Sequence, residues 1–366
     1  MRFPSLLDLE PEQQAVIDSP FHGRHVVTGG PGAGKTVMAV LRAWSLATAG
    51  REVTLFARSN LLRQYLDQAS PGLTESVTVT TFHRWVRGFW RERFQVDPPQ
   101  TDEGGWNYDW LDMQRHCVLQ RVTSTAHLVI DEGQNLPVAF YELCRVIGIG
   151  VTVFADEEQR IGEEQSSLSE IGHALSTHTD PFILRNNHRN SREIMMLASG
   201  FHDRAFTGGH TPAGSGSIPC ALRMDSLEQL VTGITQYFHA NPGRSIGIIC
   251  RYSSLLRDIQ SRLTLHSLSK YTQAYVHDDR HRMEMDFSAK PIRIVTTASM
   301  KGLEFDSVFV PDLDAYTEDP TSVDARLRFF VLCTRAREDL HFIYRGPREP
   351  AIVSSISESL LARRPG

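Results

Sequence analysis

The sequence predicts an α/β protein built from two tandem domains, each with a parallel sheet flanked by helices. Short apolar runs alternate along most of the chain with longer segments of helical periodicity, which is typical of parallel α/β folds. The first apolar run ends in the glycine-rich segment Gly29–Gly34. The length of 366 residues exceeds the roughly 100–200 residues of one ordinary domain. We expect a first domain over residues 1–180 and a second over residues 181–366.

The composition indicates a soluble cytoplasmic protein. A hydrophobic content of 41%, a charged content of 22% and a formal net charge of −5 exclude global disorder and a polybasic coat, but not a local basic groove. The N-terminal residues 1–14 lack a signal peptide's apolar core, and no apolar run approaches the roughly 20 residues that cross a bilayer. Five widely spaced cysteines favour free thiols in a reducing compartment. We therefore expect no membrane partner.

In the first half, short apolar runs predict strands, and longer segments with apolar residues every three or four positions predict helices. Gly50 is placed to end the first long helix, and the Pro, Asp and Gly residues of Asp97–Gly105 predict a loop. The expected elements are, in order, strand Arg24–Thr28, helix Lys35–Ala49, strand Val53–Ala57, helix Leu61–Ala69, strand Val77–Thr80, helix Phe82–Phe94, strand His127–Ile130 and strand Val151–Ala155, with a further helix before each of the last two strands.

The second half repeats this alternation from about Pro181. Its most linker-like segment is Gly208–Ser217, whose glycines and proline predict an exposed loop. The tail after Tyr344 is less patterned, and we expect one short helix over Ser354–Ala362. The expected elements are, in order, strand Phe182–Leu184, helix Ser191–His202, strand Pro219–Leu222, strand Ser245–Cys250, strand Ile292–Thr296, strand Ser307–Val310, helix Asp324–Ala336 and strand Leu340–Tyr344, with a helix after each of the second and third strands.

The glycine-rich turn between the first strand and the first long helix has the sequence GGPGAGKT. This fits the phosphate-binding pattern G-x-x-x-x-G-K-[ST]. Glycines let successive backbone N–H groups face a phosphate, and the helix N-terminus adds the positive end of its dipole. Lys35 is expected to reach the β- and γ-phosphates of ATP, and the Thr36 hydroxyl to bind Mg²⁺. The alternative is a glycine-rich turn without a ligand. The expected nucleotide contacts here are Gly29, Gly30, Pro31, Gly32, Ala33, Gly34, Lys35, Thr36 and Val37.

Carboxylates follow two later strands at the edge where a phosphate would lie. His127–Ile130 is followed by Asp131 and Glu132, and beside a phosphate loop Asp131 would hold Mg²⁺ while Glu132 polarises the attacking water. The next strand is followed by Asp156 and Gln159, where a glutamine would orient water without taking its proton. The alternative reading is that these residues cap or begin solvated helices.

These segments resemble the motifs of the UvrD/Rep-like helicases of superfamily 1, in the order in which that family carries them. The resemblance implies two RecA-like (P-loop NTPase) domains with the ATP site at their interface. It places the glutamine motif, Walker A, Walker B and motif III in the first domain, and motifs IV, V and VI in the second. The further matching segments are Leu9-x-x-x-Gln13, Thr80-Thr-Phe-His83, Asp131-Glu-Gly-Gln134, Leu184-Arg-Asn-Asn-His-Arg189, Lys301-Gly-Leu-Glu-Phe305 and Val331-Leu-Cys-Thr-Arg-Ala336.

The resemblance also implies roles for individual residues. Gln13 would read the adenine, and His188, where the family usually has tyrosine, would stack on it. Arg189 and Arg335 would reach from the second domain to the phosphates; an arginine finger accelerates hydrolysis by about 10³–10⁵. The alternative for both arginines is an ordinary surface position. The remaining implied contacts are Glu304 with the ribose and the Gly302 amide with the γ-phosphate.

The motifs that grip nucleic acid depart from the family pattern. Gln159 is followed by Arg160–Glu164 without the usual stacking aromatic, motif Ia is recognisable only loosely in Leu55–Asn60, and Ala298 replaces a frequent histidine. The gaps 86–125 and 205–291 are too short for the family's large inserted subdomains. We therefore expect a minimal motor core.

One segment could compensate for the missing aromatics. In Thr81–Phe94, Phe82, Trp85 and Phe89 share one helix face, and three arginines (Arg84, Arg87, Arg91) share the other. This pattern suits a single strand or an acidic partner, but it equally fits a core-facing aromatic stripe, which we favour. The charged cluster His277–His281 reads as a surface loop, with a metal site as its alternative.

The sequence thus predicts an ATP hydrolase with Mg²⁺ as cofactor that translocates on or unwinds single-stranded nucleic acid, with DNA favoured and 3′→5′ polarity implied by the resemblance. A second hypothesis is a regulatory ATPase subunit that senses nucleic acid and gates a protein partner such as a nuclease. A small-molecule kinase fits less well, because it would not need Gln159, Glu304 and Arg335 from separate motifs.

Overall fold

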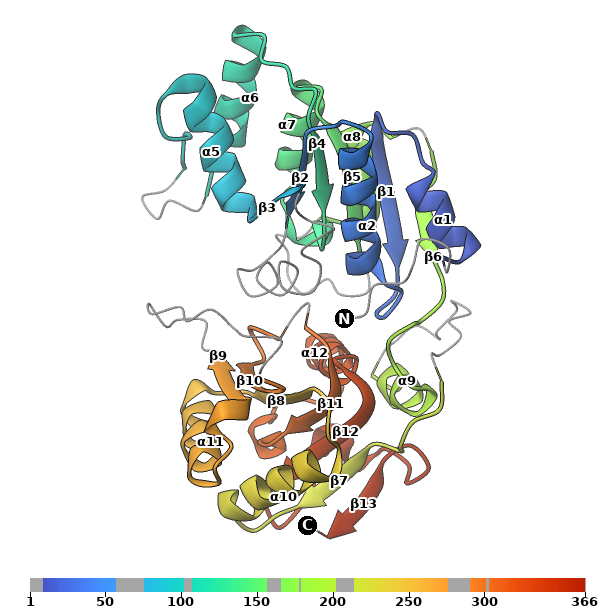
Figure 1. Cartoon of the computed structure of the whole chain (residues 1–366), viewed down its shortest axis with the longest axis vertical. Helices are drawn as coiled ribbons and strands as arrows, with labels where there is room; N and C mark the ends of the chain where they lie inside the picture. The colour runs from blue at the N-terminus through green and yellow to red at the C-terminus, as the bar shows by residue number, and fades with distance from the viewer. Residues whose placement is uncertain are drawn as a thin grey trace. The chain divides into compact units, whose positions relative to one another are not determined.

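The structure is a computed structural model that describes residues 9–56, 76–101, 107–156, 166–177, 179–201, 214–275, 290–300 and 303–365. The chain divides into two units, Met1–Arg185 and Asn186–Gly366. Each unit is an α/β domain built on its own parallel sheet (Figure 1). The predicted fold class of two parallel-sheet domains, consistent with tandem RecA-like domains, is confirmed.

The sheet of the first unit places β1 between β5 and the edge strand β6, in the order β3-β2-β4-β5-β1-β6. All its strand pairs are parallel, so the carboxyl ends of β4, β5 and β1 meet at one edge. Its strands are β1 (Arg24–Gly29), β2 (Val53–Phe56), β3 (Thr78–Thr80), β4 (His127–Ile130), β5 (Gly150–Ala155) and β6 (Phe182–Leu184).

Helices cover both faces of this sheet because successive strand residues alternate between two cores. In β4, Leu128 and Ile130 pack into one core and Val129 into the other. The core containing Val129 lies under α1 (Pro11–Ile17) and α2 (Lys35–Thr48). The other core lies under the further helices that the structure describes in this unit, α5 (Phe82–Phe94), α6 (Trp110–Leu119), α7 (Val138–Val146) and α8 (Leu168–Leu175).

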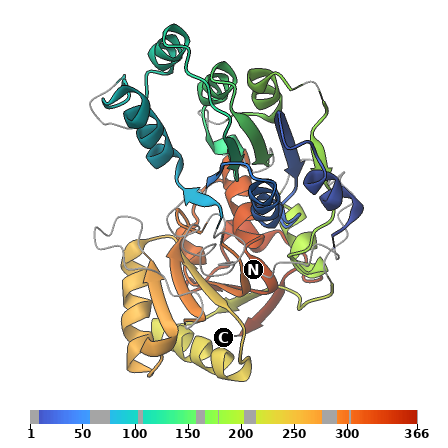
Figure 2. The same cartoon turned by 45° about the horizontal axis from the view of Figure 1, so that its top comes forward.

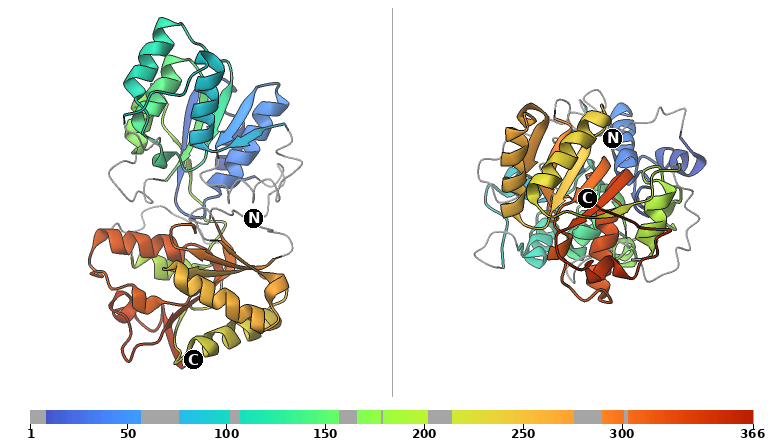
Figure 3. Two further views of the ribbon diagram at one scale, coloured as in Figure 1. Left: turned by 90° about the vertical axis from the view of Figure 1, so that its left-hand side faces the viewer. Right: turned by 90° about the horizontal axis from the view of Figure 1, so that it is seen from below.

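The second unit has a parallel sheet in the order β13-β7-β12-β11-β8-β10-β9. One face is covered by α10 (Leu227–Ala240) and α11 (Ser253–Leu265), drawn yellow and orange in Figures 2 and 3. The helices α9 (Arg192–Ser199) and α12 (Val323–Cys333) pack on β12. The strands are β7 (Cys220–Arg223), β8 (Ile246–Cys250), β9 (Thr272–Tyr275), β10 (Ile292–Thr296), β11 (Phe305–Val310), β12 (Ala336–Tyr344) and β13 (Ala362–Pro365).

Three sequence-based expectations about the second half are wrong. The strand Phe182–Leu184 does not begin the second sheet but pairs with β1, so the first unit extends to Arg185 rather than ending at residue 180. The expected helix over Ser354–Ala362 is replaced by α13 (Ala351–Ser354) and by β13, which pairs with β7. The helix expected to reach Ala336 ends at Cys333, because Ala336 already pairs with β11.

The next expectations concern single elements, the cysteines and membrane-spanning helices. The helix Phe82–Phe94 and the strand His127–Ile130 have the predicted bounds, and the five cysteines are free and buried. The expected helix Leu61–Ala69 and the cluster His277–His281 lie outside the described residues. Among the helices described, none combines the length and the apolar character needed to cross a membrane.

We expect Gly247→Ala to destabilise the protein. A Cβ at Gly247 in β8 would overlap the ring of Phe305, and forced overpacking typically costs about 1–3 kcal/mol. The matched control is Gly233→Ala within α10, where the added Cβ lies 3.7 Å from Met224; alanine there should stabilise the helix by about 0.5–1 kcal/mol. Urea unfolding of both variants measures the difference, and shifts of the same sign would contradict this packing.

Candidate nucleotide site

The glycine-rich loop joins β1 to α2 and has a backbone that only glycine adopts easily. Gly32 and Gly34 have φ values of +81° and +83°, in the left-handed region that disfavours side chains. A Cβ at Gly29 would lie 2.5 Å from the carbonyl oxygen of Leu184. Gly34 supplies no side-chain cap to the first turn of α2. The backbone N–H groups of that turn are therefore available to an anion.

Lys35 lies at the start of α2 and directs its ammonium group back over this loop. Its Nζ donates to the carbonyl oxygens of Gly29 and Gly30, at 2.5 Å and 3.0 Å, and to Oδ2 of Asp156 at 2.9 Å. Lys35 is 8% exposed and Asp156 is 1% exposed. Asp156 directly follows β5, the neighbour of β1. The parallel sheet thus brings a buried cation and a buried anion together at the ends of two adjacent strands.

Thr36 and Asp131 form the second contact at this edge. The Thr36 hydroxyl donates to Oδ2 of Asp131 over 2.8 Å, and Asp131 directly follows β4. Burial raises the pKa of Asp131, and the adjacent carboxylate of Glu132 raises it further. A bound cation would favour the charged carboxylate. A hydroxyl and a carboxylate oxygen are ligands that Mg²⁺ prefers, so these two residues fit a magnesium ion.

The residues after Asp131 are held in an unusual backbone conformation. Glu132 has a φ of +57°, which costs a non-glycine residue about 1–3 kcal/mol and is found most often at functional sites. Gln134 donates from Nε2 to Oε2 of Glu132 at 2.8 Å and accepts the backbone N–H of Asp156 at 3.0 Å. Gln134 therefore fixes the Glu132 carboxylate relative to the partner of Lys35.

Gln13 lies beside the glycine-rich loop. This α1 residue is buried, its Oε1 accepts the backbone N–H of Glu10 at 3.1 Å, and its Nε2 lies 3.7 Å from the position of a Cβ on Gly34. Arg42 of α2 holds the C-terminal end of α1 in place. The fully buried Arg42 side chain donates to the carbonyl oxygens of Ile17, Ser19 and Pro20, at 2.8 Å, 2.9 Å and 2.6 Å.

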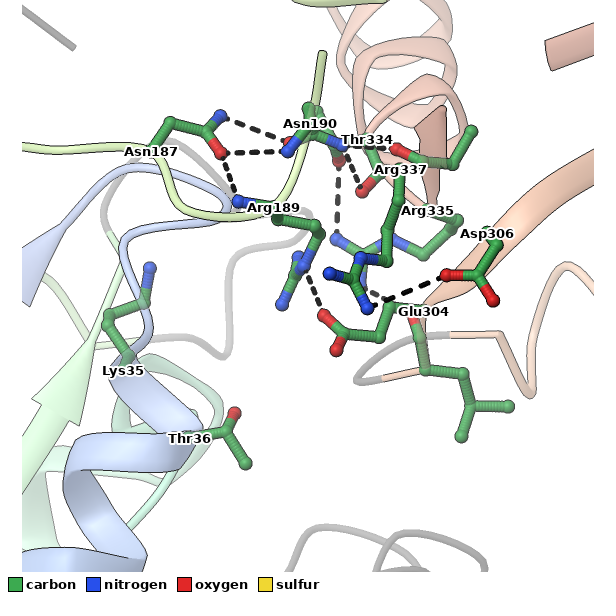
Figure 4. A network of polar contacts seen from close by, with 12 residues as sticks. Lys35, Thr36, Asn187, Arg189, Asn190, Glu304, Asp306, Thr334, Arg335 and Arg337 are labelled. Atoms are coloured by element: carbon green, nitrogen blue, oxygen red, sulfur yellow. Dashed lines mark hydrogen bonds and ion pairs between the residues drawn. The ribbon is translucent and has the colours of Figure 1, made fainter. Parts of the chain in front are cut away.

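The second unit contains a separate group of predicted residues, drawn in Figure 4. Nε of Arg189 donates to Oε2 of Glu304 over 2.6 Å. Burial alone would raise the pKa of Glu304, but the Arg189 charge and the nearby Arg337 hold it below its usual value. The Glu304 carboxylate is thus charged and engaged with Arg189, a pairing that the sequence does not predict.

Arg335 is buried within the second unit rather than lying on its surface. The side chain is 2% exposed, and it donates to the carbonyl oxygens of Val331 and Leu303, at 2.9 Å and 3.3 Å, and to the Thr334 hydroxyl at 3.2 Å. The ordinary surface position that the sequence left open is therefore wrong for Arg335. For this guanidinium to meet a phosphate, these hydrogen bonds must rearrange.

The structure therefore assembles the predicted residues into two groups, one in each unit. Asp156 and Gln134 also belong to the first group. The sequence placed Asp156 at this edge of the sheet and Gln134 in a segment that matches a family motif, but it assigned neither residue its contact with Lys35 or Glu132. His188 is exposed, and Gln159 and Gly302 lie outside the described residues. Among the residues that the structure describes, no cluster of three or more His, Cys, Asp or Glu side chains could hold a metal.

The aromatic stripe of α5 packs into the protein. Phe82, Trp85 and Phe89 lie against the core of the first unit, with the Trp85 and Phe89 rings stacked 5.0 Å apart. On the opposite side, the exposed Arg91 pairs with Asp97 over 2.7 Å. The core-facing interpretation of this stripe is confirmed, and these aromatics do not form an exposed stacking surface.

One comparison with known proteins covers the residues of this site. A family model described as an AAA domain matches residues 12–164, the segment that contains the glycine-rich loop and the Asp131-Glu132 pair. Similar solved structures include the C-terminal domain of a possible DNA helicase from Lactobacillus plantarum, with 16% identity and a TM-score of 0.37 over 48% of this chain and 98% of that one. No curated protein matches the sequence. The AAA-domain match supports an ATPase class for the first unit.

The buried ion pair of Lys35 and Asp156 predicts that their contributions to the free energy of unfolding are strongly coupled. Removing one partner of a buried ion pair typically costs about 3–5 kcal/mol, so Lys35→Ala and Asp156→Ala should each lower the free energy of unfolding. The double variant should lose clearly less than the sum of the two. The control is the exposed pair Arg91–Asp97, whose coupling should be much weaker because solvent screens it. Denaturant unfolding without nucleotide measures both cycles; additive losses for Lys35 and Asp156 would contradict the pair.

Proposed function

We propose that the chain is an ATP hydrolase that uses ATP turnover to move along single-stranded DNA. The observation that carries the proposal is the edge of the first sheet, where Lys35, Thr36, Asp131 and Asp156 meet behind a glycine-rich loop. This arrangement supplies backbone donors, an ammonium group, a hydroxyl and carboxylates at one place. Together they match the needs of a nucleoside triphosphate and its metal ion.

In this proposal each residue of the first unit has one task. The loop N–H groups bind the phosphates, and Lys35 exchanges the Asp156 carboxylate for phosphate oxygens. Thr36 and Asp131 would hold Mg²⁺, which when bound would neutralise charge on the phosphates. Glu132, kept in position by Gln134, accepts the proton of the attacking water.

Other residues of the first unit have supporting tasks. Gln13 would read the adenine edge, and Gln159 would orient the attacking water. The proposal treats the first unit as the RecA-like domain that carries the glutamine motif, Walker A, Walker B and motif III.

The second unit, with motifs IV, V and VI, would complete the site. We propose that Arg189 and Arg335 stabilise charge that develops on the transferring phosphoryl group, which is the task of arginine fingers. The partly buried ion pair with Glu304 keeps Arg189 in a defined orientation until then. His188 would stack on the adenine, while Glu304 and the Gly302 amide would contact the ribose and the γ-phosphate.

The proposal also names a nucleic-acid partner and a direction of movement. The motif resemblance supports single-stranded DNA as the track and 3′→5′ as the direction. The short gaps between the motifs support a minimal motor without large inserted subdomains, and the five free cysteines support a cytoplasmic location. A second candidate is a regulatory ATPase that gates a protein partner such as a nuclease. The burial of the α5 aromatics favours that alternative, since it removes one candidate surface for base stacking.

The proposal is tested by measuring ATP hydrolysis by the purified chain alone, with single-stranded DNA and with single-stranded RNA of the same sequence. We expect strong stimulation by DNA, because strand binding and ATP turnover should be coupled in a motor. Strand displacement on 3′- and 5′-tailed duplexes then gives the direction. A rate that DNA leaves unchanged and only a protein partner raises would support the regulatory candidate, and the absence of hydrolysis would contradict both.

We expect Glu132→Gln to bind ATP with nearly wild-type affinity and to lose hydrolysis by at least about 10²-fold, which is the range of general-base effects. Glutamine keeps the size and the hydrogen-bonding capacity of the side chain but cannot accept the proton. The matched control is Glu142→Gln on α7, where the carboxylate contacts Gln114 away from the loop. Equilibrium ATP binding and steady-state turnover separate the two effects, and retained turnover would remove Glu132 from its proposed role.

A further inference from the structure

Asn190 lies at the centre of a buried polar cluster in the second unit. The cluster consists of the loop 187–191 and the two segments 303–305 and 334–337, and Figure 4 shows most of its contacts. Asn190 is 0% exposed, so its amide is held by protein groups and not by solvent. The loop carries Arg189, and the segment 334–337 carries Arg335.

The Asn190 side chain bridges the loop and the segment that carries Arg335. Its Nδ2 donates to the carbonyl oxygen of Thr334 at 3.1 Å and also to that of Ala336. These two carbonyls belong to the residues on either side of Arg335. A single amide group thus holds the backbone before and after this arginine.

The same amide is fixed within the loop that carries Arg189. Oδ1 of Asn190 accepts from Nδ2 of Asn187 at 3.1 Å, and Oδ1 of Asn187 accepts the backbone N–H groups of Arg189 and Asn190, at 2.8 Å and 3.0 Å. The Ser191 N–H donates to the Arg337 carbonyl at 2.7 Å. The Arg189 backbone is therefore tied to the segment around Arg335 through side chains that themselves bear no charge.

The segment 303–305 contacts both arginines. Glu304 accepts from Arg189, Leu303 accepts from the Arg335 guanidinium, and the Phe305 N–H donates to the Arg335 carbonyl at 3.0 Å. Because these connections lie within the second unit, the backbones of the two arginines keep a fixed relation to each other. Buried networks in which every member is satisfied hold their geometry rigidly.

We propose that Asn190 is a positioning residue that makes Arg189 and Arg335 act on the nucleotide as one body. The inference rests on the proposed ATP hydrolysis and adds a role for a residue that does not itself touch the substrate. Misplacing a catalytic group by about 1 Å can reduce turnover by about 10²-fold. Loss of the Asn190 bridge should therefore reduce kcat far more than it changes KM for ATP.

The test is a double-mutant cycle on steady-state ATP hydrolysis by the full chain, with wild type, Asn190→Ala, Arg335→Ala and the double variant. We expect Asn190→Ala to lower kcat by about 10–10²-fold with KM changed less than about threefold. In the Arg335→Ala background it should lower kcat by a smaller factor than in the wild type, because one of the two groups that Asn190 holds together is already absent. Circular dichroism and thermal unfolding confirm that each variant is folded.

Two variants separate this role from a general loss of stability. Asn241→Ala removes an amide that bonds a backbone carbonyl (Tyr237, 2.9 Å) in the same unit but outside the cluster, and it should leave kcat unchanged. Asn190→Ser keeps one donor, so its kcat should lie between those of Asn190→Ala and wild type. It also replaces Asn190→Ala in the cycle if that variant does not fold.

The outcomes separate failure of this inference from failure of the proposed function. If the wild type hydrolyses ATP and Arg335→Ala reduces kcat, then an unchanged kcat in Asn190→Ala, or losses that simply multiply, overturns the inference alone. Unfolding of both Asn190 variants also overturns it, since the residue is then purely structural. If the wild type does not hydrolyse ATP, the proposed function fails and the inference fails with it.

Discussion

The buried ion pair between Lys35 and Asp156 is the interaction on which the arrangement of the first unit depends. It requires β1 and β5 to be adjacent and parallel, so that a helix beginning after one strand faces a carboxylate that ends the other. The Gly29 and Gly30 carbonyls satisfy the remaining donors of the ammonium group. A buried charge is tolerated only with such partners. The pair therefore sets the shape of the glycine-rich loop and the position of any phosphate that binds there.

The residues around this pair form a connected set. Gln134 links Asp156 to Glu132, and the Thr36 hydroxyl links the start of α2 to Asp131. Arg42 of α2 also bonds the C-terminal end of α1, the helix that carries Gln13. The adenine side and the phosphate side of the proposed site are thus joined through a single helix, α2. In the second unit, hydrogen bonds instead of a helix join Arg189 to Arg335.

Much of the first unit could be predicted from the sequence because local pattern and fold agree there. Apolar periodicity defined Phe82–Phe94, and the rule that parallel strands end at one edge brought Thr36 and Asp131 together. The three-residue strand Phe182–Leu184 could be recognised as extended, but a short apolar run does not specify which sheet it joins. The strand Ala362–Pro365 carries two arginines and a proline, which are typical of a sheet edge and give little strand signal. The sequence left a surface position open for Arg335 as the alternative to a phosphate contact, because its burial depends on the carbonyl of a distant segment.

A structure of the chain with a non-hydrolysable ATP analogue and Mg²⁺ tests the central claim most directly. The account predicts that the phosphates lie in the glycine-rich loop, that Lys35 has exchanged Asp156 for phosphate oxygens, and that Thr36 and Asp131 lie at the metal. It also predicts that Arg189 and Arg335 lie within hydrogen-bonding distance of the γ-phosphate. An analogue bound elsewhere, with the pair of Lys35 and Asp156 intact and both arginines directed away from it, would contradict the account.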